Sequence, residues 1–300
     1  MDASVDRPIV RNPSGSGGDP SAGQMLQSAG RRCVDALQAS RATFLKAAAP
    51  KPLHEIRVAL RRLRTLTTVY QGLLTARGQA VKTELKWLAG ELDDARDLDV
   101  FAETAGPAAR TGPALRQAVA AARTRAYARA GAALAGERWS KLTAILETML
   151  AAPGAQSAVG RARAAAPARE AAAAALKRWR KRLGGPETEL AALSPAVRHE
   201  LRLRAKKVRY AAELLGGLFG QPTRQRRFAA ALRRLQDVLG ELNDIPAGVE
   251  VARRLALESG APEAAFEAGL LAGAGAGRQK ALMKQAQRAY ERFWDARPFW

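Results

Sequence analysis

Two segments of the chain share one pattern, and each begins with one of its only two histidines. The first reads HEIRVALRRLR over residues 54–64, and the second reads HELRLRAKKVR over residues 199–209, so the histidines stand 145 positions apart. A further pair follows at nearly the same interval, LKWLAGELDDARDLDV over 85–100 and LRRLQDVLGELNDIPA over 232–247. Similarity at a fixed interval is the sequence signature of a repeated structural unit. We therefore expect a duplicated fold.

The residues around these segments favour helices. Ala, Leu, Arg, Glu, Lys and Gln are strong helix formers and dominate the chain, whereas isoleucine, which is typical of strands, occurs only four times. No stretch alternates apolar and polar side chains as a half-buried strand would. The predicted fold class is all-α. Breaks at proline and glycine place helices near 23–48, 52–75, 79–104, 114–150, 167–183, 195–216, 223–258 and 262–296.

The same breaks suggest how the chain is organised. Residues 1–22 are rich in Gly, Ser, Pro and Asp and are expected to form a disordered tail. The first helical bundle is expected over 23–151 and the second over 167–300, with the Ala-rich stretch 152–166 as a linker. Ser194 and Pro195 suit the start of a helix, and Pro246 is expected to kink or split the helix near 223–258.

Both repeated segments are amphipathic when placed on a helix, with an apolar face opposite a stripe of histidine and basic residues. Residues 51–64 contain five Lys/Arg and one Glu, and residues 198–209 contain six and one, so local acids are too few to neutralise the stripes. Because the pattern occurs twice, we expect both stripes to line one shared groove for an anion. The candidate binding residues are His54, Arg57, Arg61, Arg62, Arg64, His199, Arg202, Lys206, Lys207 and Arg209.

The charge of the whole chain also indicates an anionic partner. Its 49 Lys+Arg and 28 Asp+Glu give a formal charge of +21. Aromatic residues make up only 5%, which argues against a platform that stacks single-stranded bases. The single cysteine, Cys33, excludes an internal disulfide, and two histidines exclude most histidine zinc sites. Without a long apolar run or a signal-peptide pattern, a cytoplasmic protein with no membrane contact is expected.

The repeated strings resemble the CHAD domain, a family named for conserved histidines in an α-helical domain. The matching strings are His54–Arg64, Leu85–Val100, His199–Tyr210 and Leu235–Asp244, and the ending RFWDARPFW is similar as well. The resemblance covers about residues 25–300. It implies two four-helix bundles related by pseudo-twofold symmetry, and binding of inorganic polyphosphate along a basic surface between them. We expect no cofactor and no metal, and we expect that binding can place the protein on polyphosphate granules. Many relatives carry a neighbouring triphosphate-tunnel domain, for which this chain has no matching pattern, so a stand-alone binder is expected.

The chemistry of polyphosphate suits such stripes independently. Polyphosphate carries about one charge per phosphate and no bases, so a protein that binds it needs guanidinium and ammonium groups rather than stacking rings. A histidine that faces phosphates is expected to have a raised pKa. Further basic residues form a second tier of candidates. They are Arg31, Arg32, Lys82, Lys86, Lys280, Lys284 and Arg288.

Two other charged clusters have simpler interpretations. Asp93, Asp94, Asp97 and Asp99 could help to hold magnesium, but helix capping and salt bridges to arginines such as Arg96 are the preferred interpretation. The basic residues of 178–182 surround a tryptophan on all sides of one predicted helix, which is more typical of a solvated helix end.

Two alternatives to polyphosphate binding remain at the level of sequence. A nucleic-acid-binding protein of the nucleoid type would show the same salt-dependent attraction, because both polymers release counterions. An enzyme that cleaves phosphates would need a metal or a carboxylate base, and only the aspartates of 93–99 offer one. We expect a binding protein without catalytic residues.

Overall fold

The computed structural model describes residues 19–74, 76–105, 112–155 and 157–300, and most of the predicted tail lies outside them. The described residues contain no strand, which confirms the all-α prediction. Two short 3-10 helices, Gln71–Leu73 and Gly216–Phe219, follow α2 and α9. The α-helices are α1 (Ala22–Lys46), α2 (Pro50–Val69), α3 (Ala76–Glu91), α4 (Asp93–Ala105), α5 (Pro113–Ala135), α6 (Glu137–Ala151), α7 (Ala158–Ala165), α8 (Ala168–Lys181), α9 (Pro195–Leu215), α10 (Pro222–Ser259) and α11 (Pro262–Asp295).

Helix starts follow the expected local chemistry. Ser194 caps α9 by accepting a hydrogen bond from the backbone N–H of Val197, and Pro195 occupies the first turn. Ser21 and Gln24 form a reciprocal capping box at the start of α1. The turn from α10 to α11 needs Gly260, whose φ of 65° lies in the left-handed region.

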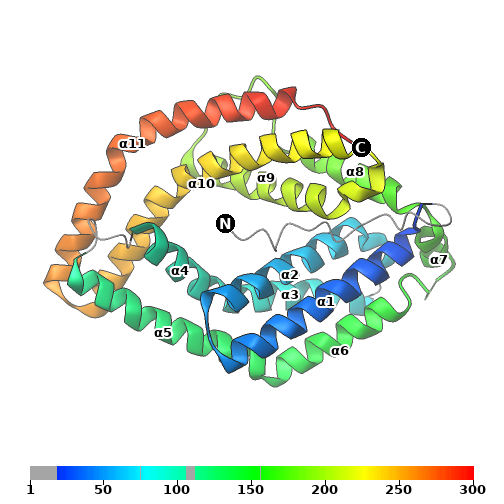
Figure 1. Ribbon diagram of the computed structural model, residues 1–300, viewed down its shortest axis with the longest axis horizontal. Coiled ribbons are helices and arrows are strands. Elements are labelled where there is room, and N and C mark those ends of the chain that lie inside the picture. Colours follow the sequence, from blue (N-terminus) through cyan, green and yellow to red (C-terminus); the bar gives the residue numbers. More distant parts are fainter. Residues whose placement is uncertain (1–18, 75, 106–111, 156) are drawn as a thin grey trace.

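Several boundaries differ from the sequence prediction. The helix expected over 79–104 is two helices, because the chain turns at Leu92 and α4 then begins with two aspartates, which favour a first turn. The helix expected over 114–150 is interrupted at Gly136, which is extended and serves as N-cap of α6. The segment 152–166 contains α7. Pro246 does not end α10, and Figure 1 shows this long helix bending along its course.

The chain folds so that its first and last thirds lie on opposite sides of the molecule (Figure 1). α1, α2, α3 and α6 pack together in one half, and α8, α9, α10 and α11 pack together in the other. α5 belongs to the first half by sequence, but it also packs against α10 and α11. The buried apolar residues consequently form one continuous core that draws on both halves. The pseudo-twofold relation between the halves stays a prediction.

α2 and α9, the helices that carry the repeated strings, pack directly against each other. Their apolar residues, such as Leu60 and Leu63 on α2 and Val208 on α9, are buried in the core. This orientation leaves the basic stripes of both helices at the boundary between the halves. Among the described residues, no helix is long and apolar enough to cross a membrane.

Candidate functional site

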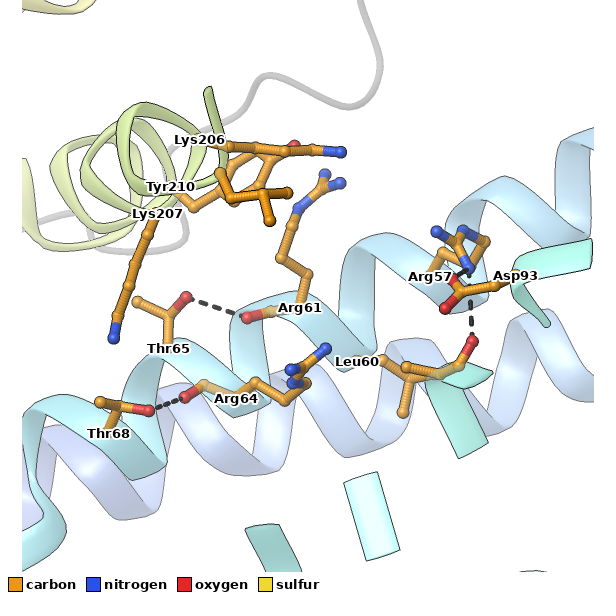
Figure 2. Close-up of a pocket in the computed structure, with 12 residues that line it drawn as sticks. Arg57, Leu60, Arg61, Arg64, Thr65, Thr68, Asp93, Lys206, Lys207 and Tyr210 are labelled. Atoms are coloured by element: carbon orange, nitrogen blue, oxygen red, sulfur yellow. Dashed lines mark hydrogen bonds and ion pairs between the residues drawn. The ribbon is translucent and has the colours of Figure 1, made fainter. Parts of the chain in front are cut away.

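A pocket of about 440 Å³ lies between α2 and α9, and basic side chains from both helices line it. α2 contributes Arg57, Arg61 and Arg64, and α9 contributes Lys206 and Lys207. Figure 2 shows the amino group of Lys206 and the guanidinium of Arg61 reaching toward the same space. The structure therefore brings together five of the predicted residues from two segments far apart in the sequence. The remaining lining residues are Leu60, Thr65, Thr68, Ala89, Asp93, Leu203 and Tyr210.

Arg61 is held in place by an aromatic ring from the opposite helix. Its guanidinium carbon lies 3.6 Å from the centre of the Tyr210 ring, and Arg209 approaches the same ring at 4.7 Å. The buried Nε of Arg61 has no hydrogen-bond partner. Burial lowers the pKa of Arg61 to about 10, yet the group stays charged at neutral pH. A buried, positioned cation with an unused donor is suited to an anionic ligand.

Four arginines lie near the amino group of Lys206. Burial, followed by the charges of Arg202, Arg61, Arg57 and Arg209, lowers its pKa to about 8. Each of these effects disfavours the protonated amine. A bound anion would offset the repulsion from the neighbouring arginines and would favour the protonated form of Lys206. The electrostatics of the pocket therefore favour a negatively charged ligand.

Acidic residues from other helices neutralise part of the stripes, which the local sequence did not reveal. Arg57 donates a hydrogen bond to the Asp93 carboxylate at the start of α4. Arg202 lies 3.5 Å from Asp244 on α10. The scarcity of acids within the stripes therefore does not leave these two arginines unpaired. The reason is that their partners come from elements distant in the sequence.

Arg209 is also occupied within its own half of the molecule. It donates hydrogen bonds of 2.7 Å to Gln236 and 2.9 Å to Glu213. It does not line the pocket, although it still approaches Tyr210.

The two histidines sit at the margins of this arrangement. His54 is half-buried, and burial together with Arg96, Arg61 and Arg57 lowers its pKa. The direction at His54 is therefore opposite to the raised pKa that we expected for a histidine facing phosphates. His199 is exposed, and its Nδ1 lies 2.5 Å from Oδ1 of Asn243. Neither histidine lines the pocket.

The remaining candidates divide between the pocket and other surfaces. Arg62 faces α1, where its charge acts on Cys33. Arg31 lines a separate cavity between α1 and α6. Lys82 lies near enough to Lys207 to lower its pKa.

Four candidates lie on exposed surfaces of α3 and α11. Lys86 is one turn beyond Lys82 on α3. Lys280, Lys284 and Arg288 are exposed on α11, which packs against α10 and α5 on the outer side of the molecule (Figure 1).

The aspartates of 93–99 serve mainly as ion-pair partners. Asp94 pairs with Arg129, and the buried Asp99 accepts hydrogen bonds from Arg123 and from the Tyr127 hydroxyl. No group of three or more potential metal ligands occurs in the part of the chain that the structure describes.

Sequence reasoning missed Tyr210 and Thr65 as pocket residues. Tyr210 directly follows the basic string of α9, so an aromatic residue at the end of such a string was the available signal. Thr65 gives no signal, because its hydroxyl bonds to the Arg61 carbonyl as threonines on many helices do.

The sequence matches a known protein family. The CHAD domain family model matches residues 28–253, three quarters of the chain. The chain belongs to the CHAD domain family. No curated protein matches the sequence.

Two solved structures share the CHAD fold of this chain. The crystal structure of the CHAD domain from the plant Ricinus communis matches with a TM-score of 0.75 and 22% identity, covering 98% of each chain. PptA from Streptomyces chartreusis matches with a TM-score of 0.64 and 21% identity, covering 91% of this chain and 99% of its own. At this level of identity the likeness concerns the fold alone.

Proposed function

We propose that this CHAD protein binds inorganic polyphosphate in the pocket between α2 and α9. The observation that carries the proposal is that two cationic stripes from opposite halves of the molecule line one pocket. A flexible chain with a charge on every phosphate can contact many of these cations at once. Membership of the family supports the same ligand.

The side chains of the pocket support binding rather than cleavage. Asp93 is the only carboxylate among the described residues that line it, and it is paired with Arg57. A general base needs an unprotonated acceptor beside the ligand, whereas Lys206, with its pKa of about 8, is mostly protonated at pH 7 and acts as a cation. The protein should therefore leave the length of polyphosphate unchanged, and its attachment to polyphosphate granules would follow from binding alone.

The proposal is tested by competition between long-chain polyphosphate and duplex DNA, matched for charge and measured at two salt concentrations. We expect polyphosphate to bind more tightly, because the pocket offers phosphate ligands and no groups that read bases. Removing one cation from each helix, as in Arg64→Gln with Lys206→Gln, should weaken polyphosphate binding by about tenfold or more.

The control variant Lys280→Gln with Lys284→Gln removes the same charge from the outer face of α11 and should bind almost normally. Equal affinity for DNA and polyphosphate, or equal loss in both variants, would contradict the proposal. Shortening of polyphosphate on a gel, with or without magnesium, would contradict the absence of catalysis.

A further inference from the structure

The cations around the pocket are unequally neutralised. Toward α4 and α10, Arg57 is paired with Asp93, and Arg202 with Asp244. Toward α3 and α8, five basic residues have no ion pair with any carboxylate in the described part of the chain. We call this set the unpaired end. It consists of Arg64, Lys82, Arg178, Arg182 and Lys207.

Lys207 connects the pocket to α8. It is a lining residue of the pocket, and its amino group lies 4.2 Å from the centre of the Trp179 ring on α8. Figure 2 shows its side chain running away from Lys206, along the side of the pocket formed by Thr65 and Thr68. Lys207 therefore points out of the pocket toward α8 rather than into the space shared by Arg61 and Lys206.

The cations of α8 and α3 lie around this amino group. α8 packs against both α9 and α2. Its end is held to α9 by a hydrogen bond of 3.1 Å from Arg204 to the Arg182 carbonyl. Arg178 stands one helical turn before Arg182, and both side chains are exposed. Partial burial, and then the charges of Arg182, Arg178, Arg64 and Lys82, lower the pKa of Lys207, so all four charges act on one point.

A concentration of exposed positive charge without acidic partners is costly for a folded protein, because like charges repel. The sequence pattern of residues 178–182 suggested an ordinary solvated helix end. The fold instead places two of these arginines close enough to Lys207, which lines the pocket, for their charges to act on its amino group.

We propose that the unpaired end is an extension of the binding site, along which a linear phosphate polymer leaves the pocket and is held by Arg178 and Arg182. This inference rests on the proposed function. It adds an expected chain-length dependence, because a short oligophosphate held between Arg61 and Lys206 should leave Arg178 and Arg182 unused, whereas a long chain can contact both sets of cations.

The test compares tripolyphosphate and long-chain polyphosphate on three proteins. They are the wild type, Arg178→Gln with Arg182→Gln, and the control Lys280→Gln with Lys284→Gln. Both variants remove two exposed cations that stand four residues apart, so their net charges are equal. In the α8 variant we expect affinity for long chains to fall about tenfold, with a shallower salt dependence, and affinity for tripolyphosphate to change less than about twofold.

Each other outcome has a definite meaning. A loss for long chains no greater than that of the α11 control overturns the extension. Equal losses for short and long chains also overturn it, since the arginines would then belong to the pocket itself. Failure of the wild type to bind either phosphate polymer refutes the proposed function rather than the extension.

Discussion

Lys206 is the pocket residue whose charge changes nearest to neutral pH. Burial and four neighbouring arginines lower its pKa to about 8, well below that of an exposed lysine. As pH rises through 8, Lys206 loses its proton in the free protein, and the attraction for an anion falls. A bound anion favours the protonated form, so binding in this range takes up a proton.

We therefore expect affinity for polyphosphate to fall between pH 7 and pH 9 in the wild type. Lys206→Arg should reduce this fall, because a guanidinium keeps its charge over the whole range. Isothermal titration calorimetry in buffers of different ionisation enthalpy measures the proton uptake directly. The same pH dependence in the wild type and in Lys206→Arg would show that another group is responsible.

Tyr210 illustrates what single residues add to a charged pocket. Its ring lies between two guanidinium groups, at 3.6 Å from Arg61 and 4.7 Å from Arg209. Each such contact is worth about 0.5–2 kcal/mol, depending on how far the cation is desolvated. The ring keeps two mutually repelling cations in fixed positions, and so the site does not need to be ordered by its ligand.

At the scale of elements, the start of α4 brings a carboxylate into the pocket. Asp93 and Asp94 are neighbours of similar exposure, and each pairs with an arginine. Only Asp93 lines the pocket, where its carboxylate would compete with a bound phosphate for Arg57. Asp94 pairs with Arg129 on α5 instead.

Asp93→Asn should raise the affinity for polyphosphate by about threefold or more, because an exposed ion pair is worth about 0.2–1 kcal/mol and a negative charge is also removed from the pocket. Asp94→Asn is the matched control and should change affinity much less. The measurement is the affinity of each variant for polyphosphate, taken from binding curves at one salt concentration. A larger gain in Asp94→Asn would place the competing charge elsewhere.

The elements also show how far the sequence could predict the fold. Helix-forming residues, prolines and caps are local signals, so the all-α class and starts such as Pro195 could be recognised. The turn at Leu92 has only weak local signals, namely Gly90 before it and Asp93 and Asp94 after it, and the sequence prediction placed one helix across it. The stripes on α2 and α9 were visible as periodic patterns. Their acidic partners were not, because Asp93 and Asp244 meet Arg57 and Arg202 only after folding.

For the molecule as a whole, the pocket lies where the two halves meet. α2 and α9 come from opposite halves, and their basic stripes repel across the contact. A formal charge of +21 adds repulsion throughout the protein. A polyanion bound between the helices neutralises this repulsion and holds both halves together, so it should stabilise the whole fold against unfolding.

Thermal unfolding should therefore respond to polyphosphate more than to simple salt. At a free polyphosphate concentration of about 100 Kd, binding adds about 2.7 kcal/mol, which corresponds to a rise in Tm of about 4 °C for a protein of this size. Orthophosphate at the same phosphate concentration and ionic strength should give a much smaller rise, since screening acts without linking the halves. The variant Arg64→Gln with Lys206→Gln should start from an equal or higher Tm, because repulsion is relieved, yet gain less from polyphosphate. Equal rises with both phosphates, or an undiminished rise in the variant, would show that stabilisation comes from general screening and not from a polymer held between α2 and α9.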